Sequence, residues 1–477
     1  MIWENGDREV RSDGSISHLP ARYSLVIAQP RAVLRLQRGQ NEYLRPSEVA
    51  PSLRCSPQHD DPFKFISREL RARGLVYEGL AARPRFPYPT GGVFGFIAYD
   101  VARYFERIPQ MEAHHTEPDI YLLSSETVVI VDRLLGTAAV IGTPADDSRR
   151  SSDRSKLAVE QVSRALEAFA TSTEPTLSAV HSAMTSSTAD SSLKPLFSKT
   201  EFMELVRRAK EYIAAGDVFQ VVLANTFTLP QVRDPLALFE LLRLSNPSPY
   251  HFMVRFDSHT LVGASPEVML RGQKGSGEQG GSRTEVNMRL VAGTYPRASD
   301  PAEDQQQSAQ LAKDEKERAE HLMLVDHARN DIGRVAAVGS VEVKDLFAIE
   351  SYSNIHHLVS EVSGVLRTRE NVLTALRSCF PIATLTGTPK IRAMEIIAEL
   401  EGVSRGIFGG AFVALGDCGG IDSAVAIRSI LCGAQESIVK AGAGIVYDSN
   451  EEREFAECLL KAKALAEAVL MSQELAQ

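Results

Sequence analysis

Two pairs of glutamates, far apart in the sequence, carry the strongest constraint on how this chain folds. Glu317 and Glu320 lie in DEKERAEHLMLVDHARND, and Glu454 and Glu457 lie in DSNEEREFAECLLKAKALAEAV. Both stretches are typical of helices, in which residues three apart share one face. Either pair alone is more simply a solvated helix surface. If the two faces meet, four carboxylates surround one position, and such an all-oxygen setting is typical of Mg²⁺ sites.

The composition is that of an ordinary globular protein. The chain has 477 residues, of which 44% are hydrophobic and 24% charged, enough for one large core or two domains. No apolar run approaches the ~20 residues that span a bilayer, and the N-terminus has no signal-like apolar region. The net charge of -9 argues against nucleic acid and anionic membranes as partners. Reduced thiols in a cytoplasm are expected, because five cysteines lie scattered without CxxC spacing: Cys55, Cys379, Cys418, Cys432 and Cys458.

The sequence divides into an N-terminal β-rich region at 1–170, a Ser/Thr-rich linker at 171–196 and a larger core at 197–477. Runs of β-branched residues at 126–131 and 137–141, separated by Leu135-Gly136, predict a hairpin. The stretch RGQKGSGEQGGSRTE predicts a flexible loop between two strands. Alternation of helices with short strands predicts an α+β or layered α/β fold. Helical patterns are found at 156–170, 200–215, 234–245, 302–335, 371–379, 389–401 and 451–472.

Nine segments of the core follow one another in a recognisable order: GDVFQVVLA, NPSPYHF, VGASPEVML, VAGTYPR, DEKERAEHLMLVDHARNDIGRV, YSNIHHLVSEVSG, TLTGTPKIRAMEII, DSAVAIRS and KAGAGIVYDSNEEREFAE. With these segments the core resembles a known family, the chorismate-utilising enzymes, and within it the large subunits of anthranilate synthases. The N-terminal stretch GGVFGFIAYDVARYFE is similar to that family as well. The resemblance implies a layered α/β sandwich of two packed antiparallel-rich sheets with helices outside and the site between them.

In that family, ammonia adds to C2 of chorismate, the 4-hydroxyl leaves, and pyruvate is then eliminated. The resemblance implies that a metal and a cation hold the two substrate carboxylates. Arg428 matches the arginine that binds the pyruvyl carboxylate, a group that suits a planar bidentate donor. Gly442 and Gly444 match glycines whose N–H groups approach the same carboxylate, and Lys461 matches a lysine near the metal. The family's Mg²⁺ ligands correspond to Glu317, Glu320, Glu454 and Glu457.

Three further matches concern the amination. Glu267 in GASPE matches the glutamate that assists departure of the 4-hydroxyl, for which a raised pKa is expected. Gln220 stands where members that add water carry a basic lysine, and a glutamine cannot take a proton, so amination is favoured over hydration. Ala292 stands where para-aminating members often carry a nucleophilic lysine, which favours direct attack at C2.

The elimination and the ring pocket complete the implied site. His357 matches the family histidine beside the ring, and a neutral imidazole suits proton abstraction near pH 7. Its neighbour His356 is expected to be structural. Gly293, Thr294 and Thr384 match positions that line the ring pocket.

The sequence also departs from the family. Phe408 stands where anthranilate synthases usually have a tyrosine, so one hydroxyl donor to the pyruvyl group is missing. Tryptophan-inhibited members carry Leu-Leu-Glu-Ser where residues 25–29 read LVIAQ, so we expect tryptophan inhibition to be weak for want of a carboxylate, although NPSPY at 246–250 remains. We expect no glutamine amidotransferase domain to follow the core. Ammonia is therefore expected from solution or from a glutamine amidotransferase subunit, in a homo- or hetero-oligomer.

The combined prediction is a cytoplasmic Mg²⁺-dependent lyase that makes anthranilate from chorismate, in tryptophan-type aromatic amino acid biosynthesis or in secondary metabolism. One alternative enzyme releases 2-amino-2-deoxyisochorismate without pyruvate elimination. A second alternative is an aminodeoxychorismate synthase, which Ala292 disfavours, and isochorismate synthesis is disfavoured by Gln220. The alternative outside enzymology is a silent scaffold that only binds an amidotransferase. Turnover of chorismate separates these possibilities.

Overall fold

We describe the protein from a computed structural model. The described residues are 1–10, 16–27, 30–37, 40–44, 61–64, 66–67, 91–109, 111–112, 117–125, 127–142, 156, 159–160, 162–163, 193–246, 248–276, 282–298, 300–351, 355–416 and 419–474. The predicted linker at 171–196 and the predicted helix at 156–170 lie almost wholly outside these residues, as do Cys55 and Cys418. The described part of the chain has no helix both long and apolar enough to cross a membrane.

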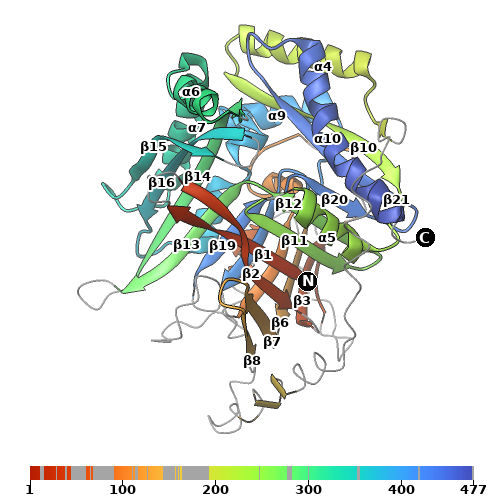
Figure 1. Ribbon diagram of the computed structural model, residues 1–477, viewed down its shortest axis with the longest axis vertical. Helices are drawn as coiled ribbons and strands as arrows, with labels where there is room; N and C mark the ends of the chain where they lie inside the picture. Colours follow the sequence, from red (N-terminus) through yellow and green to blue (C-terminus); the bar gives the residue numbers. More distant parts are fainter. Residues whose placement is uncertain are drawn as a thin grey trace.

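Two antiparallel sheets form the centre of the molecule (Figure 1). One parallel bridge, between Ile16 and Glu350, joins their edges. The first sheet has the order β9 (Lys194–Pro195), β10 (Gln220–Pro230), β21 (Glu436–Ile445), β20 (Ser429–Cys432), β12 (His259–Ser265), β11 (Tyr250–Phe256), β1 (Ile2–Val10), β2 (Ile16–Ile27), β7 (Thr127–Asp132) and β8 (Thr137–Gly142), and short β17 (Gly387–Thr388) also pairs with β10.

The second sheet is built in the same way from strands of both halves of the chain. Strands from the N-terminal region therefore pair directly with strands of the core in each sheet. The order is β15 (Glu342–Ser351), β16 (Ile355–Val365), β14 (Ser282–Pro296), β13 (Val268–Ser276), β19 (Ile421–Val425), β18 (Ala411–Gly416), β5 (Gly92–Ile97), β6 (Ile120–Ser125), β3 (Pro30–Gln37) and β4 (Gln40–Leu44).

The two sheets bury a shared apolar layer between them. Phe252 of the first sheet stacks on Phe412 of the second, with ring centroids 4.7 Å apart. Both rings are fully buried, and complete removal of such side chains from water stabilises a fold by about 1.5–3 kcal/mol each. The layer of aromatic and branched side chains between β2, β5, β6, β11 and β18 is what holds the sandwich together.

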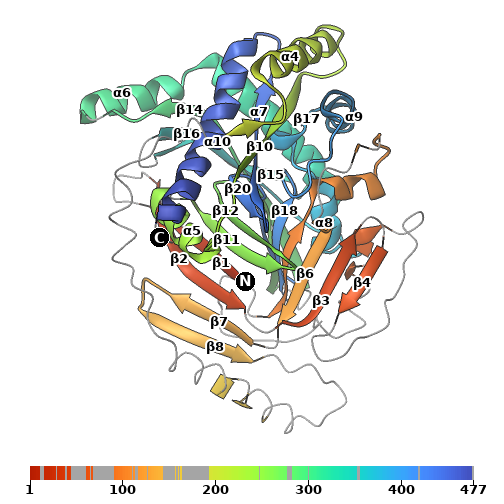
Figure 2. The same ribbon diagram turned by 90° about the vertical axis from the view of Figure 1, so that its right-hand side faces the viewer.

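Helices cover the outer faces, as the resemblance predicts. On the first sheet, α5 (Pro235–Ser245) and α10 (Glu451–Glu474) pack on β10, β20 and β21. The helices α4 (Lys199–Ala214) and α9 (Lys390–Glu401) pack beside them. On the second sheet, α7 (Glu315–Gly333) and α8 (Val372–Cys379) pack on β13 and β14. The helix α6 (Pro301–Leu311) precedes α7, and Figure 2 shows both helix groups at the end of the molecule opposite β7 and β8.

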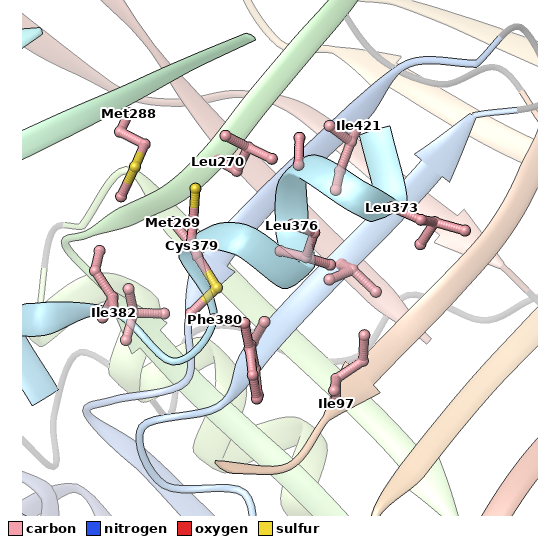
Figure 3. Packing of buried hydrophobic residues seen from close by; sticks show 14 of the residues in the cluster. Ile97, Met269, Leu270, Met288, Leu373, Leu376, Cys379, Phe380, Ile382 and Ile421 are labelled. Atoms are coloured by element: carbon pink, nitrogen blue, oxygen red, sulfur yellow. The ribbon is translucent and has the colours of Figure 1, made fainter. Parts of the chain in front are cut away.

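The core under the second sheet is apolar and continuous (Figure 3). Leu373, Leu376 and Cys379 of α8 belong to one buried cluster with Leu270 of β13 and Met288 of β14. Cys379, like Cys432 and Cys458, is a buried free thiol, which agrees with the expected reduced cysteines.

The structure confirms the predicted α+β fold, the hairpin at β7 and β8, and most helices, and it corrects two predictions. The predicted helix at 302–335 is in fact two helices, because the Asp314 side chain accepts hydrogen bonds from the backbone N–H groups of Lys316 and Glu317 and so begins α7. The predicted loop after Leu270 is mostly strand, since β13 extends to Ser276 and β14 pairs with it from Ser282; residues 277–281 lie outside the described residues.

Candidate active site

Glu267 lies in the turn between β12 and β13 and is buried, with 7% of its surface exposed. Its Oε1 accepts a hydrogen bond of 2.6 Å from the Thr384 hydroxyl, which the short helix η3 (Ala383–Leu385) presents. Burial raises the pKa of Glu267 to about 7, although Thr384, Arg428 and Lys461 each act to lower it. A carboxyl group with this pKa is partly protonated at neutral pH and can donate a proton.

Two cationic side chains face this carboxyl group. Arg428 lies between β19 and β20 with a positive φ of 46°, and its Nη1 donates to Asn246 Oδ1 at 3.4 Å. Its side chain is accessible to water, yet burial among protein atoms lowers its pKa. The two observations are compatible when protein atoms surround a guanidinium that still contacts water. Lys461, on α10, donates to the Gly442 carbonyl at 2.9 Å and to Glu457 at 2.7 Å.

His357 lies on β16 and is held through one ring nitrogen. Its Nδ1 is 3.2 Å from the Gly293 carbonyl oxygen and 3.0 Å from Thr294 Oγ1. A carbonyl oxygen can only accept, so Nδ1 carries the proton and Nε2 carries the lone pair. Burial is the main cause that lowers the pKa of His357, and the charges of Arg428 and Arg289 lower it further. The imidazole is therefore neutral near pH 7 and suits the role of a base.

A bulge in β14 places the neighbouring backbone. The register between β14 and β16 shifts between Ala292 and Thr294, and Gly293 has φ of +81°. A Cβ at Gly293 would lie 2.9 Å from Leu358 Cδ1 and 3.2 Å from Glu317 Oε2. Glycine is required here both by the backbone conformation and by this close approach. Gly293 therefore connects the predicted base to the first glutamate pair.

The two glutamate pairs face one another from α7 and α10. The pKa of Glu320 is raised by burial and then by the neighbouring charges of Glu317 and Glu454. The pKa of Glu454 is likewise raised by burial and by Glu457. Carboxylates that disfavour each other's ionisation, on two helices, form an oxygen-only donor set of the kind Mg²⁺ prefers.

Two of these four carboxylates lie beside lysines on their own helices. Glu457 pairs with Lys461, and Glu320 lies 3.9 Å from Lys316. Within the described ranges no three acidic, histidine or cysteine side chains are close enough to hold one metal ion. The donor chemistry fits Mg²⁺, and binding would require these side chains to leave their lysine partners.

Gln220 and the glycines of β21 lie side by side. A Cβ at Gly444 would lie 2.5 Å from the Gln220 side-chain nitrogen, so the amide group covers the glycine. Gly442 leaves room for Leu223 O, which a Cβ would approach to 2.8 Å. Ala292 offers its carbonyl to His321, a buried residue that the sequence gave no reason to single out. His321 Nε2 also bonds Ser360 Oγ of β16 at 2.7 Å, so His321 ties α7 to both the bulged strand β14 and its neighbour β16.

Two further positions singled out in the sequence, Phe408 and His356, are buried. Phe408 is buried in the core cluster, with its ring centroid 6.0 Å from the Arg405 guanidinium. His356 bonds Ser351 at 2.8 Å and Asp304 at 2.9 Å and has the structural role expected of it.

Residues 25–29 supply no carboxylate, as the sequence indicates, and weak tryptophan inhibition stays a prediction. A carboxylate nevertheless lies near β2, because β1 pairs with β2 and places Glu4 opposite Ser24 on β2 and His251 on β11. Glu4 is 1% exposed, its Oε1 accepts from Ser24 and Arg133, and its Oε2 is buried without a hydrogen-bond partner among the described residues. The sequence comparison missed it because the strand that carries the acid precedes the strand that we inspected.

The predicted residues are thus brought together as one connected set. Arg428 acts on the charge state of both Glu267 and His357. Lys461 links Glu267 to the second glutamate pair, and Gly293 links His357 to the first. Cationic and anionic side chains therefore act together on one acid and one base.

Comparison with known proteins agrees with this arrangement. The chorismate binding enzyme family matches residues 22–467. The chain therefore belongs to that family, and the prediction that it is an enzyme of this kind is confirmed. Similar proteins include the anthranilate synthase component 1 of Aquifex aeolicus, 39% identical over 95% of this chain and 87% of that protein, and that of Thermus thermophilus, 41% identical over 83% of this chain and 81% of that protein.

Solved structures show the same fold. Anthranilate synthase component I from Streptococcus pneumoniae matches 94% of this chain and 93% of its own with a TM-score of 0.77 and 30% identity. The menaquinone-specific isochorismate synthase of Escherichia coli, at 18% identity and a TM-score of 0.61, shares the fold.

Proposed function

We propose that this enzyme converts chorismate and ammonia into anthranilate, pyruvate and water. The observation that carries the proposal is the pairing of a buried acid, Glu267, with a neutral histidine, His357, under the influence of one arginine, Arg428. The names of the relatives at 39% and 41% identity support the same reaction.

The first step asks Glu267 to act as an acid. Ammonia forms a bond to C2, the ring double bonds shift, and the C4–O bond breaks. The leaving hydroxyl takes the proton of Glu267 and departs as water. The pKa of about 7 keeps a useful fraction of this carboxyl group protonated at neutral pH, and the Thr384 hydroxyl at 2.6 Å fixes the carboxyl group in place.

The second step asks His357 to act as a base. Its Nε2 accepts the proton from C2, the C3–O bond breaks, and the enolpyruvyl group leaves as pyruvate, so that the ring becomes aromatic. The hydrogen bonds of Nδ1 to Gly293 and Thr294 hold the tautomer that this step requires. In this proposal, Arg428 binds the pyruvyl carboxylate.

Gln220 and Ala292 favour amination at C2 over the related reactions. Gln220 cannot deprotonate water, and ammonia needs no deprotonation before it attacks. Ala292 has no nucleophile that could form a covalent adduct. Phe408 lacks the hydroxyl of the usual tyrosine, which favours the second candidate, release of 2-amino-2-deoxyisochorismate before elimination.

The proposed cofactor is Mg²⁺, held by Glu317, Glu320, Glu454 and Glu457. When bound, the ion would reverse the negative local field and hold the ring carboxylate. The second component implied by the relatives' names is, in our proposal, a glutamine amidotransferase that delivers ammonia.

The test is direct. The purified chain is incubated with chorismate, ammonium and Mg²⁺, and the products are identified by mass spectrometry. Anthranilate and pyruvate in equal amounts support the proposal, and an accumulating non-aromatic amine supports the second candidate. If the folded protein consumes no chorismate, the remaining hypothesis is a silent scaffold that only binds an amidotransferase. Gln220→Lys serves as a matched variant, because it should raise the hydrated product at the expense of the aminated one.

A further inference from the structure

Arg405 is a buried arginine behind the acid side of the site. It follows α9, and its side chain is 1% exposed. Its Nε and Nη2 donate to both carboxylate oxygens of Glu401, at 2.9 Å and 2.5 Å. The remaining hydrogen bonds go to two backbone carbonyl oxygens, from Nη1 to Leu385 at 2.6 Å and from Nη2 to Val222 at 2.7 Å. The guanidinium also lies over the Tyr99 ring, 4.9 Å from its centroid.

The first carbonyl belongs to the segment that presents Thr384. Leu385 directly follows Thr384 in η3. The hydrogen bond from Arg405 therefore holds the backbone next to the residue whose hydroxyl bonds Glu267. A three-residue helix has little rigidity of its own. The Thr384 hydroxyl then donates to Glu267 at 2.6 Å. The path from Arg405 to Glu267 thus runs through two hydrogen bonds and the backbone between Leu385 and Thr384.

The second carbonyl belongs to the strand that presents Gln220. Val222 lies two residues after Gln220 on β10, and its N–H donates to the carbonyl of Thr386 at 2.9 Å. The Ala224 N–H donates to Glu401 at 2.9 Å. In the ion pair, Glu401 accepts a hydrogen bond from β10 and Arg405 donates one to β10. Arg405 also donates to η3, so the pair sets the spacing between η3 and β10.

The charged groups around Glu267 come from other elements and are not altered by this arrangement. Arg428 faces it from the loop between β19 and β20, and Lys461 faces it from α10. Asp100 and Glu401 face Arg405 itself. Apart from the Phe408 ring, 6.0 Å from its guanidinium, Arg405 reaches the described site residues through peptide groups and the Glu401 carboxylate, so its role is positioning and not direct catalysis.

We propose that Arg405 is a positioning residue that clamps η3 against β10 and so holds Thr384 on Glu267 and Gln220 over the ring pocket. The inference rests on the proposed function only in assigning Glu267 as the acid. A lysine in this place keeps the charge but has a single nitrogen, so it cannot bond Glu401 and both carbonyl oxygens in this fork geometry.

The test is a cycle of Arg405→Lys and Thr384→Val, read from the pH dependence of kcat. Thr384→Val removes a hydrogen bond that stabilises the ionised form of Glu267, so the pKa of Glu267 should rise. The alkaline limb of the pH profile of kcat should then move to higher pH. Arg405→Lys should move the limb in the same direction and lower kcat at least tenfold with KM within about threefold. In the Thr384→Val background, Arg405→Lys should move the limb no further. Equal movement in both backgrounds, or none, would overturn the inference.

A matched control and a structural readout separate this inference from general damage. Arg103→Lys also replaces an arginine that bonds a buried carboxylate, Asp119, and should lower thermal stability without moving the limb. If Arg405→Lys does not fold, the double variant Arg405→Met, Glu401→Leu removes both charges of the buried ion pair together. Crystal structures decide the geometry even if the parent turns over no chorismate: retention of the 2.6 Å bond between Thr384 and Glu267 in the variant contradicts the clamp.

Discussion

Glu267→Gln should stabilise the fold, and by an amount that depends on pH. Glutamine has nearly the same volume as glutamate and can still accept the Thr384 hydrogen bond. It differs in that it never ionises. The pKa of Glu267 is raised from its ordinary 4.5 to about 7 because burial disfavours the charged form. A difference of about 2.5 in pKa corresponds to about 3 kcal/mol of lost stability when the group is ionised.

The sign follows from proton binding. Below about pH 4.5 the carboxyl group is protonated in both the folded and the unfolded chain, and it costs nothing. Between about pH 4.5 and 7 the unfolded chain loses the proton while the folded chain keeps it, so the free energy of unfolding falls as pH rises. Above about pH 7 both are ionised and the full cost remains. The difference between Glu267→Gln and parent should therefore grow between pH 5 and 8 and then level off.

Urea unfolding of both proteins in chelator, at pH 5, 6, 7 and 8, measures this difference. All other carboxyl groups titrate in both proteins and cancel. Glu467→Gln, at an exposed position in the middle of α10, serves as the control and should show no such trend. A difference that stays constant with pH, or a variant less stable than the parent at pH 8, would refute the argument that burial strains this acid. The same variant should lose the amination step, since the amide cannot donate a carboxyl proton.

The remaining predictions concern the metal, the base and the inhibitor region. Glu457→Gln should lower Mg²⁺-dependent turnover by at least a hundredfold and weaken Mg²⁺ binding measured by calorimetry, and full activity in excess chelator would contradict the metal assignment. His357→Met should still consume chorismate but accumulate the non-aromatic amine, seen by mass spectrometry; anthranilate formed at the parental rate would mean that another group is the base. Glu4→Gln should raise the tryptophan concentration for half-inhibition by tenfold or more, because a hydrogen bond to a charged group contributes about 1.5–3 kcal/mol, and equal inhibition of parent and variant would exclude Glu4 from the inhibitor pocket.

Local sequence patterns could predict most helices because the signals that start and end them are local. Asp234 and Asn371 accept hydrogen bonds from the first N–H groups of α5 and α8, and Gly402 ends α9 in the left-handed conformation. The same kind of signal explains why the helix predicted at 302–335 is too long. Asp314 lies inside that prediction, but in the structure it is the N-cap of α7 and accepts a hydrogen bond from the Glu317 N–H.

The environment of each site residue could not be predicted in that way. The pKa of Glu267 depends on burial, on Thr384 and on two cations, and all of these come from distant segments. The tautomer of His357 depends on a bulge at Gly293 that no spacing rule specifies. Glu4 was missed for a related reason: its importance appears only when β1 pairs with β2 and β11.

Under the proposed function, the distribution of charged side chains around the site determines how a substrate with two carboxylates is oriented. Arg428 is a cationic group that acts on Glu267, and the four glutamates of α7 and α10 form an anionic group in which Lys461 already pairs with Glu457. Without a metal, both carboxylates would compete for Arg428, and the glutamates would repel either one. With Mg²⁺, the glutamates would attract one carboxylate and Arg428 the other, so that the ring would be held between them. The metal would then govern the orientation of chorismate as well as its affinity, and an analogue that lacks the ring carboxylate should bind to Arg428 with an affinity independent of Mg²⁺.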